Sequence, residues 1–160
     1  MDAIDRLSPL ATRKNVKLET GNLPEARILG DLQTLLQMVS NLIENAIKYT
    51  EGQEKKVKIE TGVTKNQSWI RVSDNGPGIL SEHLPNLFDR FYRVEQARTR
   101  DSDDMSNSNS QSSSGLGLSI VQWIAQAHGG EVSVKCSLGN GSSFEVQFEA
   151  LETLQKKGNS

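Results

Sequence analysis

The 160-residue sequence has no apolar run near the roughly 18 residues that a membrane-spanning helix needs, and its N-terminus lacks the apolar core of a signal peptide. It also lacks an excess of basic charge, because the formal net charge is -2. A broad nucleic-acid-binding surface is therefore disfavoured, and any phosphate ligand needs a local site. We expect a cytoplasmic chain with no direct membrane contact and no nucleic-acid partner. The 35% hydrophobic content suffices for one domain with a core.

Cysteine is nearly absent, and so are the common phosphate-binding motifs. The single cysteine, Cys136, follows Val132 and Val134 on one face of an alternating segment, which favours a buried thiol over a reactive one and fits a reducing cytoplasm. There is no GxxxxGK[ST] segment, and both Gly-x-Gly pairs lack the third glycine of a dinucleotide fingerprint. The two nucleotide-binding folds that use these motifs are therefore disfavoured.

Hydrophobic periodicity predicts a chain of alternating strands and helices. The weak apolar repeat of residues 1–15 is broken by Pro9 and predicts only a linker. The polar, serine-rich run at 101–114 predicts a mobile loop, and the polar end of the chain a frayed tail. We expect strands at 16–20, 26–30, 55–63, 67–76, 131–136 and 142–149, helices at 31–50 and 115–130, and a short interrupted helix at 80–94.

The predicted helix at 31–50 has two distinct faces. Its polar side groups Asn41, Asn45 and Lys48, although asparagine is a mediocre helix former. A solvated face is one explanation; the other is that amide oxygens bind Mg²⁺ while the lysine neutralises phosphate. An arc of roughly 140°, at about 100° per residue, forms the core-facing stripe: Leu32, Leu35, Leu36, Val39, Leu42, Ile43, Ala46 and Ile47.

Two glycine motifs gain meaning only in combination with this helix. Alone, DNGPG at 74–78 is typical of a turn, and the glycines of GLGLSI at 115–120 could simply permit close packing. Together they suggest a ligand. Asp74 could accept from the amine of adenine, backbone N–H groups at 115–118 could bind phosphate at a helix N-terminus, and an arginine could stabilise a transferred phosphoryl group. The predicted ligand is Mg-ATP.

Four ordered segments, NLIENAIKYT, DNGPGI, LFDRFYRV and GLGLSI, resemble the N, G1, F and G2 boxes of the catalytic, ATP-binding domain of sensor histidine kinases. The resemblance spans residues 30–149. It implies an α/β (α+β) two-layer sandwich of the Bergerat type, a mixed sheet covered on one face by helices. We therefore expect a catalytic domain at 16–150 with an ATP lid at about 95–114, a linker at 1–15 from a missing upstream acceptor domain, and a flexible tail at 151–160.

The resemblance also implies roles for individual residues. Asn45 would bind Mg²⁺, Asn41 and Lys48 would contact phosphates, Asp74 would recognise adenine, and Arg93 would reach the γ-phosphate. Those four functions account for the nucleotide's base, phosphates and metal. The remaining residues implied at the nucleotide are Tyr49, Gly76, Gly78, Ile79, Gly115, Leu116, Gly117 and Leu118.

Transfer to a protein is favoured over hydrolysis. Related ATPases activate water with a glutamate at the position of Asn41, and a neutral amide is no general base. Glu44 is a possible base in a kinase, so the predicted catalytic residues are Asn41, Glu44, Lys48 and Arg93. A regulatory nucleotide-binding module without transfer, and a serine kinase of the anti-sigma type, remain alternatives.

The acceptor itself is not predicted within this chain. Its only histidines are His83, expected at the surface, and His128, expected to cap a helix end; neither lies in an acceptor motif. The expected partners are therefore a histidine-containing dimerisation domain of the same parent kinase and a downstream response regulator. Phe88 and Phe91 are expected to pack, and Arg90 is equally compatible with a surface ion pair and a ligand role.

Overall fold

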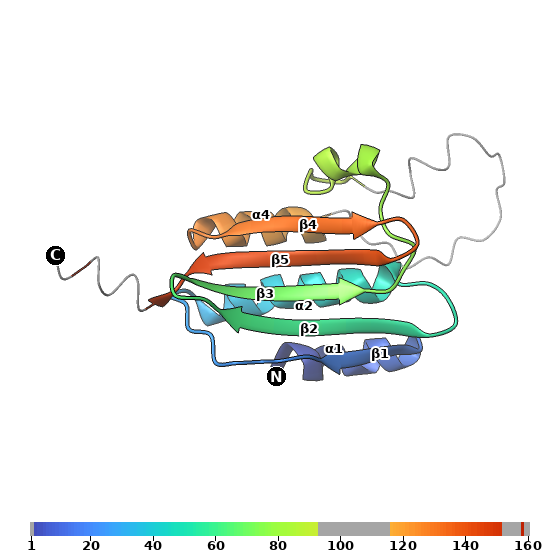
Figure 1. Ribbon diagram of the computed structural model, residues 1–160, viewed down its shortest axis with the longest axis horizontal. Helices are drawn as coiled ribbons and strands as arrows, with labels where there is room; N and C mark the ends of the chain where they lie inside the picture. Colours follow the sequence, from blue (N-terminus) through green and yellow to red (C-terminus); the bar gives the residue numbers. More distant parts are fainter. Residues whose placement is uncertain (1, 93–115, 152–157, 159–160) are drawn as a thin grey trace.

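The computed structural model describes residues 2–92, 116–151 and 158, which form two layers (Figure 1). One layer is a five-stranded mixed sheet in the order β1-β2-β3-β5-β4. Strand β1 runs parallel to β2, and the other neighbours are antiparallel. The strands are β1 Val16–Thr20, β2 Lys55–Val63, β3 Gln67–Asp74, β4 Glu131–Ser137 and β5 Gly141–Glu149.

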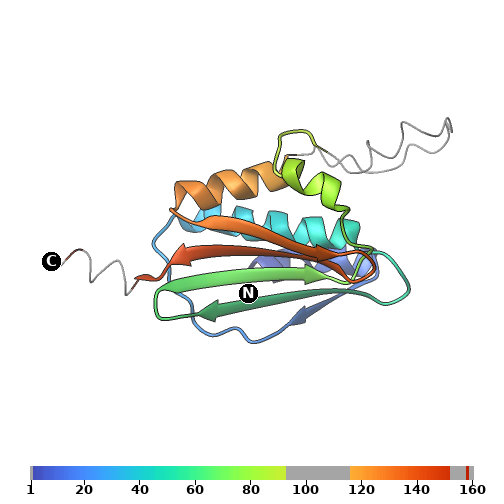
Figure 2. The same cartoon turned by 45° about the horizontal axis from the view of Figure 1, so that its top comes forward.

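Helices cover one face of this sheet, and Figure 2 shows α2 and α4 side by side above it. Alternating residues of the strands, such as Val57, Val72 and Val146, are buried beneath the helices. The two-layer sandwich implied by the sequence is confirmed. The helices are α1 Asp2–Arg13, α2 Leu32–Tyr49 and α4 Gly117–Ala127, with a 3₁₀ helix, η1, at Ser81–Asn86.

Helix α2 spans the domain and carries much of the core. Asp31 is its N-cap, with the carboxylate accepting from the backbone N–H of Thr34 at 2.8 Å. The predicted apolar stripe is confirmed except at Leu32, which is 65% exposed, whereas the unpredicted Met38 is buried. Angular periodicity assigns a helix face but does not say how far along the helix the core extends.

Two segments differ from the sequence prediction. Residues 2–13 form a packed helix instead of a linker, with Ala3 and Ala11 buried and apolar neighbours against the core. Pro9 lies inside this helix, so apolar burial outweighs the backbone hydrogen bond that proline cannot donate. The strand expected at 26–30 is absent: this stretch has no regular structure, although Ile28 packs against the core.

Several predicted features lie outside the described residues. These are the ATP lid at about 95–114, Arg93, Gly115 and most of the tail. The upstream acceptor domain stays a prediction. Within the ranges that the structure describes, no helix combines the length and apolar character needed to cross a membrane.

Candidate functional site

The polar face of α2 is present as predicted, and one of its groups is unsatisfied. Asn41, Asn45 and Lys48 are all half-buried. The Asn41 Nδ2 atom is buried and has no hydrogen-bond partner among the described residues. Leaving such a buried donor without a partner costs free energy, on the order of 1–3 kcal/mol. Lys48 Nζ lies 2.9 Å from Glu44 Oε1 one helical turn away, in a partly exposed ion pair.

Strand β3 ends at Asp74, whose carboxylate is held by backbone groups. The N–H of Gly76 donates to Asp74 Oδ1 at 2.9 Å, and the backbone N–H of Ser142 donates to the same carboxylate. Burial raises the pKa of Asp74, and these two hydrogen bonds oppose the rise. The following turn contains Gly78, whose φ of 79° is in the region that favours glycine.

The turn packs tightly against the end of α2. A Cβ atom at Gly76 would lie 2.8 Å from the carbonyl oxygen of Tyr49 and 3.1 Å from Cα of Thr50. Only glycine therefore allows the backbone after Asp74 to approach the helix this closely. The structure thus brings the half-buried Tyr49 and the carboxylate-bearing turn together, and the predicted position of Tyr49 near a nucleotide stays a prediction.

The β4–β5 hairpin supports the same turn from its other side. The N–H of Gly139 donates to the carbonyl of Pro77 at 2.9 Å, and the Cys136 thiol donates to the carbonyl of Ile79 at 3.3 Å. Cys136 is half-buried, so its predicted buried position is met only in part. Its hydrogen bond gives the thiol a structural role in placing Ile79.

Helix α4 begins with the second glycine motif. Leu116 precedes the helix and its carbonyl accepts from Ser119 Oγ at 2.8 Å, while Leu118 packs against the core. Among the residues that the structure describes, a Cβ atom at Gly117 would meet nothing within 4 Å. The open space there is consistent with the predicted position near a ligand. Helix α4 also packs on α2, so the first turn of α4 and the polar face of α2 belong to the same helical layer.

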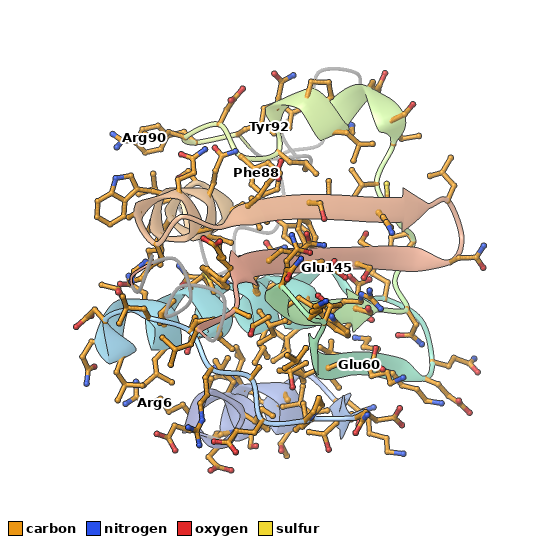
Figure 3. All side chains as sticks on the ribbon, turned by 60° about the vertical axis from the view of Figure 1, so that its left-hand side comes forward. Arg6, Glu60, Phe88, Arg90, Tyr92 and Glu145 are labelled. Atoms are coloured by element: carbon orange, nitrogen blue, oxygen red, sulfur yellow. The ribbon has the colours of Figure 1, made fainter. Side chains whose placement is uncertain are left out.

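The segment after η1 corrects two expectations. His83 is 4% exposed instead of lying at the surface, because its Nδ1 atom and the Tyr92 hydroxyl form a 2.5 Å hydrogen bond. Phe88 packs edge-on against Phe144, as expected, but Phe91 is 65% exposed at φ 63° and does not pack. Figure 3 shows Arg90 pointing outward, and it is exposed.

His128 caps α4, as predicted, and also joins two helices. Its Nδ1–H donates to the carbonyl of Ile124 at 2.8 Å, while its Nε2 accepts from the backbone N–H of Asp31 at 3.2 Å. The ring therefore ties the end of α4 to the N-cap of α2. Both ring nitrogens are engaged in these structural hydrogen bonds.

The described part of the site has no dense cluster of metal-binding side chains. Across residues 2–92 and 116–151, no group of three or more His, Cys, Asp or Glu side chains could hold a metal ion. The amide oxygens of Asn41 and Asn45 are the suitable donors on the polar face of α2. Mg²⁺ accepts such a sparse protein site because it retains water and binds substrate phosphates.

Sequence and structure comparisons agree with this arrangement. The chain is 36% identical to the sensor histidine kinase YkoH of Bacillus subtilis over 85% of its own length and 27% of the relative's. It is 36% identical to the sensor protein SrrB of Staphylococcus aureus over 74% of its own length and 18% of the relative's. The chain therefore spans only about a quarter of these relatives or less.

Solved structures place the fold in the same group. The mycobacterial sensor histidine kinase MprB superposes with a TM-score of 0.73 at 25% identity, covering 93% of this chain and 94% of that one. Full-length ShkA in complex with AMPPNP gives a TM-score of 0.75 at 26% identity, over 93% of this chain and 29% of that one. The family described as histidine kinase-, DNA gyrase B- and HSP90-like ATPase matches residues 30–152, most of the chain, and the protein belongs to this family.

Proposed function

We propose that this chain binds Mg-ATP and transfers the γ-phosphoryl group to a histidine on a separate dimerisation domain of a longer sensor kinase, which passes it to a response regulator. The observation that carries the proposal is a juxtaposition. A half-buried carboxylate at the end of β3 lies beside the last turn of α2, whose polar face presents two amides and a lysine. Its kinship with sensor kinases supports the reaction class.

Asp74 would recognise the base of ATP. Two backbone N–H groups fix its carboxylate and leave further lone pairs to accept from the exocyclic amine of adenine. Guanine does not present a donor at that position. Partial burial strengthens such a hydrogen bond, because water competes less for the carboxylate.

The other end of the nucleotide would lie along α2 and the start of α4. Asn41 Nδ2, the buried donor without a partner, would donate to a phosphate oxygen, and Lys48 would exchange Glu44 for phosphate. Backbone N–H groups of residues 116–118 at the start of α4 would add donors. Asn45 would hold Mg²⁺ through its amide oxygen; the ion, when bound, neutralises phosphate charge.

The metal role has a binding test. Asn45→Ala removes the amide oxygen, so we expect the affinity for ATP to lose its dependence on Mg²⁺. Asn45→Asp keeps an oxygen ligand and is the matched control, which should retain that dependence. Titrations by calorimetry, with Mg²⁺ and with a chelator, measure it. An unchanged dependence in Asn45→Ala would remove the residue from the metal site.

The histidines of this chain support an acceptor elsewhere. His83 is buried and bonded to Tyr92, and both ring nitrogens of His128 are engaged at the helix end. Burial keeps His83 from an approaching phosphoryl group, and the two structural hydrogen bonds of His128 occupy both of its ring nitrogens. Asn41 also replaces the carboxylate that a hydrolase needs for activating water, which favours a protein acceptor over water.

Labelling with γ-labelled ATP tests the reaction. The chain is incubated with and without the parent's acceptor domain, and Asp74→Asn serves as the control that should bind little nucleotide. Acid-labile label on the acceptor is the expected result. Label found only in free phosphate would indicate an ATPase, acid-stable label a serine kinase, and bound but unchanged ATP a regulatory module.

A further inference from the structure

Asn75, which lies between Asp74 and Gly76, is the most extensively bonded side chain of the turn. Its Oδ1 accepts from the Thr50 hydroxyl at 3.0 Å and from the backbone N–H of Lys56 at 2.7 Å. Its Nδ2 donates to the carbonyl of Glu54 at 2.6 Å. The Asn75 backbone N–H adds a bond to the carbonyl of Lys56 at 3.3 Å. The amide therefore connects the turn to two other segments of the chain.

One of these connections leads to the helix that carries the proposed phosphate ligands. Thr50 is the C-cap of α2, its backbone N–H donates to the carbonyl of Ala46 at 3.0 Å, and the residue is only 3% exposed. Its position is consequently fixed to the last turn of the helix. Asn45 and Lys48 lie in or next to that turn. The Thr50–Asn75 hydrogen bond therefore links them to Asp74, which directly precedes Asn75 in the chain.

We propose that Asn75 is a positioning residue that sets the separation and orientation of the adenine-binding turn relative to the phosphate-binding helix. This inference rests on the proposed function. ATP must satisfy both sub-sites at once, and its affinity exceeds that of either fragment only if the two are held at a matching separation. A preset geometry lowers the ordering cost of binding.

The chemistry of the side chain explains why an amide is suited to this position. Asn75 simultaneously accepts from a hydroxyl and an N–H and donates to a carbonyl. Aspartate has the acceptors but no donor, and serine has a single rotatable hydroxyl. Asn75 has no need to touch the nucleotide, because its side-chain Oδ1 and Nδ2 atoms are both bonded within the protein.

The test compares ATP with its two fragments. Dissociation constants for ATP, adenosine and magnesium tripolyphosphate are measured by NMR titration on the wild-type chain, Asn75→Ala and Thr50→Val. We expect ATP affinity to fall about fivefold to tenfold in each variant, the size of one or two lost hydrogen bonds. The affinities for adenosine and tripolyphosphate should stay within about twofold of wild type.

A role in stability alone would give a different pattern. Thr50→Ser keeps the hydroxyl and should restore ATP affinity, and the Thr50→Val, Asn75→Ala double variant should bind ATP no worse than Asn75→Ala, because the hydroxyl acts through the amide. ATP affinity unchanged in Asn75→Ala, or adenosine affinity falling in parallel with it, would overturn the proposal. Asp74→Ala distinguishes failure of this proposal from failure of the proposed function. If Asp74→Ala binds ATP with wild-type affinity, the proposed function itself fails.

Discussion

The two halves of the candidate site differ in how completely their polar groups are satisfied. In the turn after β3, Asp74 and Asn75 are bonded to backbone groups and to Thr50. On the polar face of α2, Asn41 Nδ2 has no partner among the described residues, and Lys48 contacts Glu44 in a partly exposed pair. The turn is preorganised, whereas the helix face keeps polar groups available. Under the proposed function, the base would be recognised by a rigid site and the phosphates by groups that exchange partners.

The largest effect is expected when the rigid half loses its acceptor. Asp74→Asn replaces one carboxylate oxygen by an amine, so the side chain can no longer accept from Gly76, Ser142 and adenine together. We expect ATP affinity to fall about a hundredfold, the size of a lost charge-assisted hydrogen bond. Calorimetric titration measures the change. Intact affinity would show that Asp74 does not bind adenine.

The stability of Asp74→Asn should depend on pH differently from the stability of wild type. Because burial raises the pKa of Asp74, the folded protein binds its proton more tightly than the unfolded chain, so wild-type stability contains a contribution that is lost as pH rises through the raised pKa. Asp74→Asn lacks this loss. Its stability relative to wild type should therefore increase as pH rises from the ordinary pKa of an aspartate through the raised pKa of Asp74. A difference in urea midpoints that does not change with pH would contradict the assignment.

Gly76 and Gly117 test the contrast between the two halves of the site, because a side chain added at each would meet different surroundings. Gly76→Ala forces a Cβ against the backbone of Tyr49 and Thr50 and should destabilise the fold by about 2 kcal/mol. Gly117→Ala places a Cβ in open space at the start of α4 and should be neutral or stabilising by up to about 1 kcal/mol. Urea denaturation of both variants measures this. Equal destabilisation would mean that the two halves are packed alike.

Sequence reasoning predicted the secondary-structure elements better than it predicted the tertiary contacts. Helix α2 has a strict apolar periodicity, and strands β2, β3 and β5 alternate apolar and polar residues. These patterns predict where the elements lie, because each element has one face toward the core and one toward solvent. The sequence does not predict the N-terminal helix because Pro9 suggests a break, whereas burial of Ala3 and Ala11, with further apolar side chains packed against the core, stabilises it. Burial between distant segments leaves no local signal.

The same limit applies within the site. Asp74 and Asn45 were predicted from motifs, but Asn75 was treated as an ordinary turn residue because its partners, Thr50 and Glu54, are more than twenty positions away. The expected surface position of His83 is wrong for a different reason: its partner, the Tyr92 hydroxyl, is nearby in sequence, but no local pattern shows that the two side chains form a hydrogen bond.

A smaller effect is expected at the unsatisfied amide of the helix face. Asn41→Ala removes a buried donor that has no partner in the described structure, so stability should change by less than about 1 kcal/mol or increase. ATP affinity should nevertheless fall about fivefold, because a phosphate contact is lost. Gln37→Ala, at an exposed position of the same helix, is the control and should leave affinity unchanged. Strong destabilisation of Asn41→Ala would show that the amide already has a structural partner.

The smallest change separates Glu44's two possible roles. Glu44→Gln breaks a partly exposed ion pair with Lys48, and the cost in stability should be about 0.5 kcal/mol or less. ATP affinity should stay constant or rise slightly, because Lys48 is released toward phosphate. If Glu44 also acts as a base, transfer to the acceptor should fall while binding does not, a loss confined to kcat. Transfer at the wild-type rate would leave Glu44 only the role of holding Lys48 until the nucleotide binds.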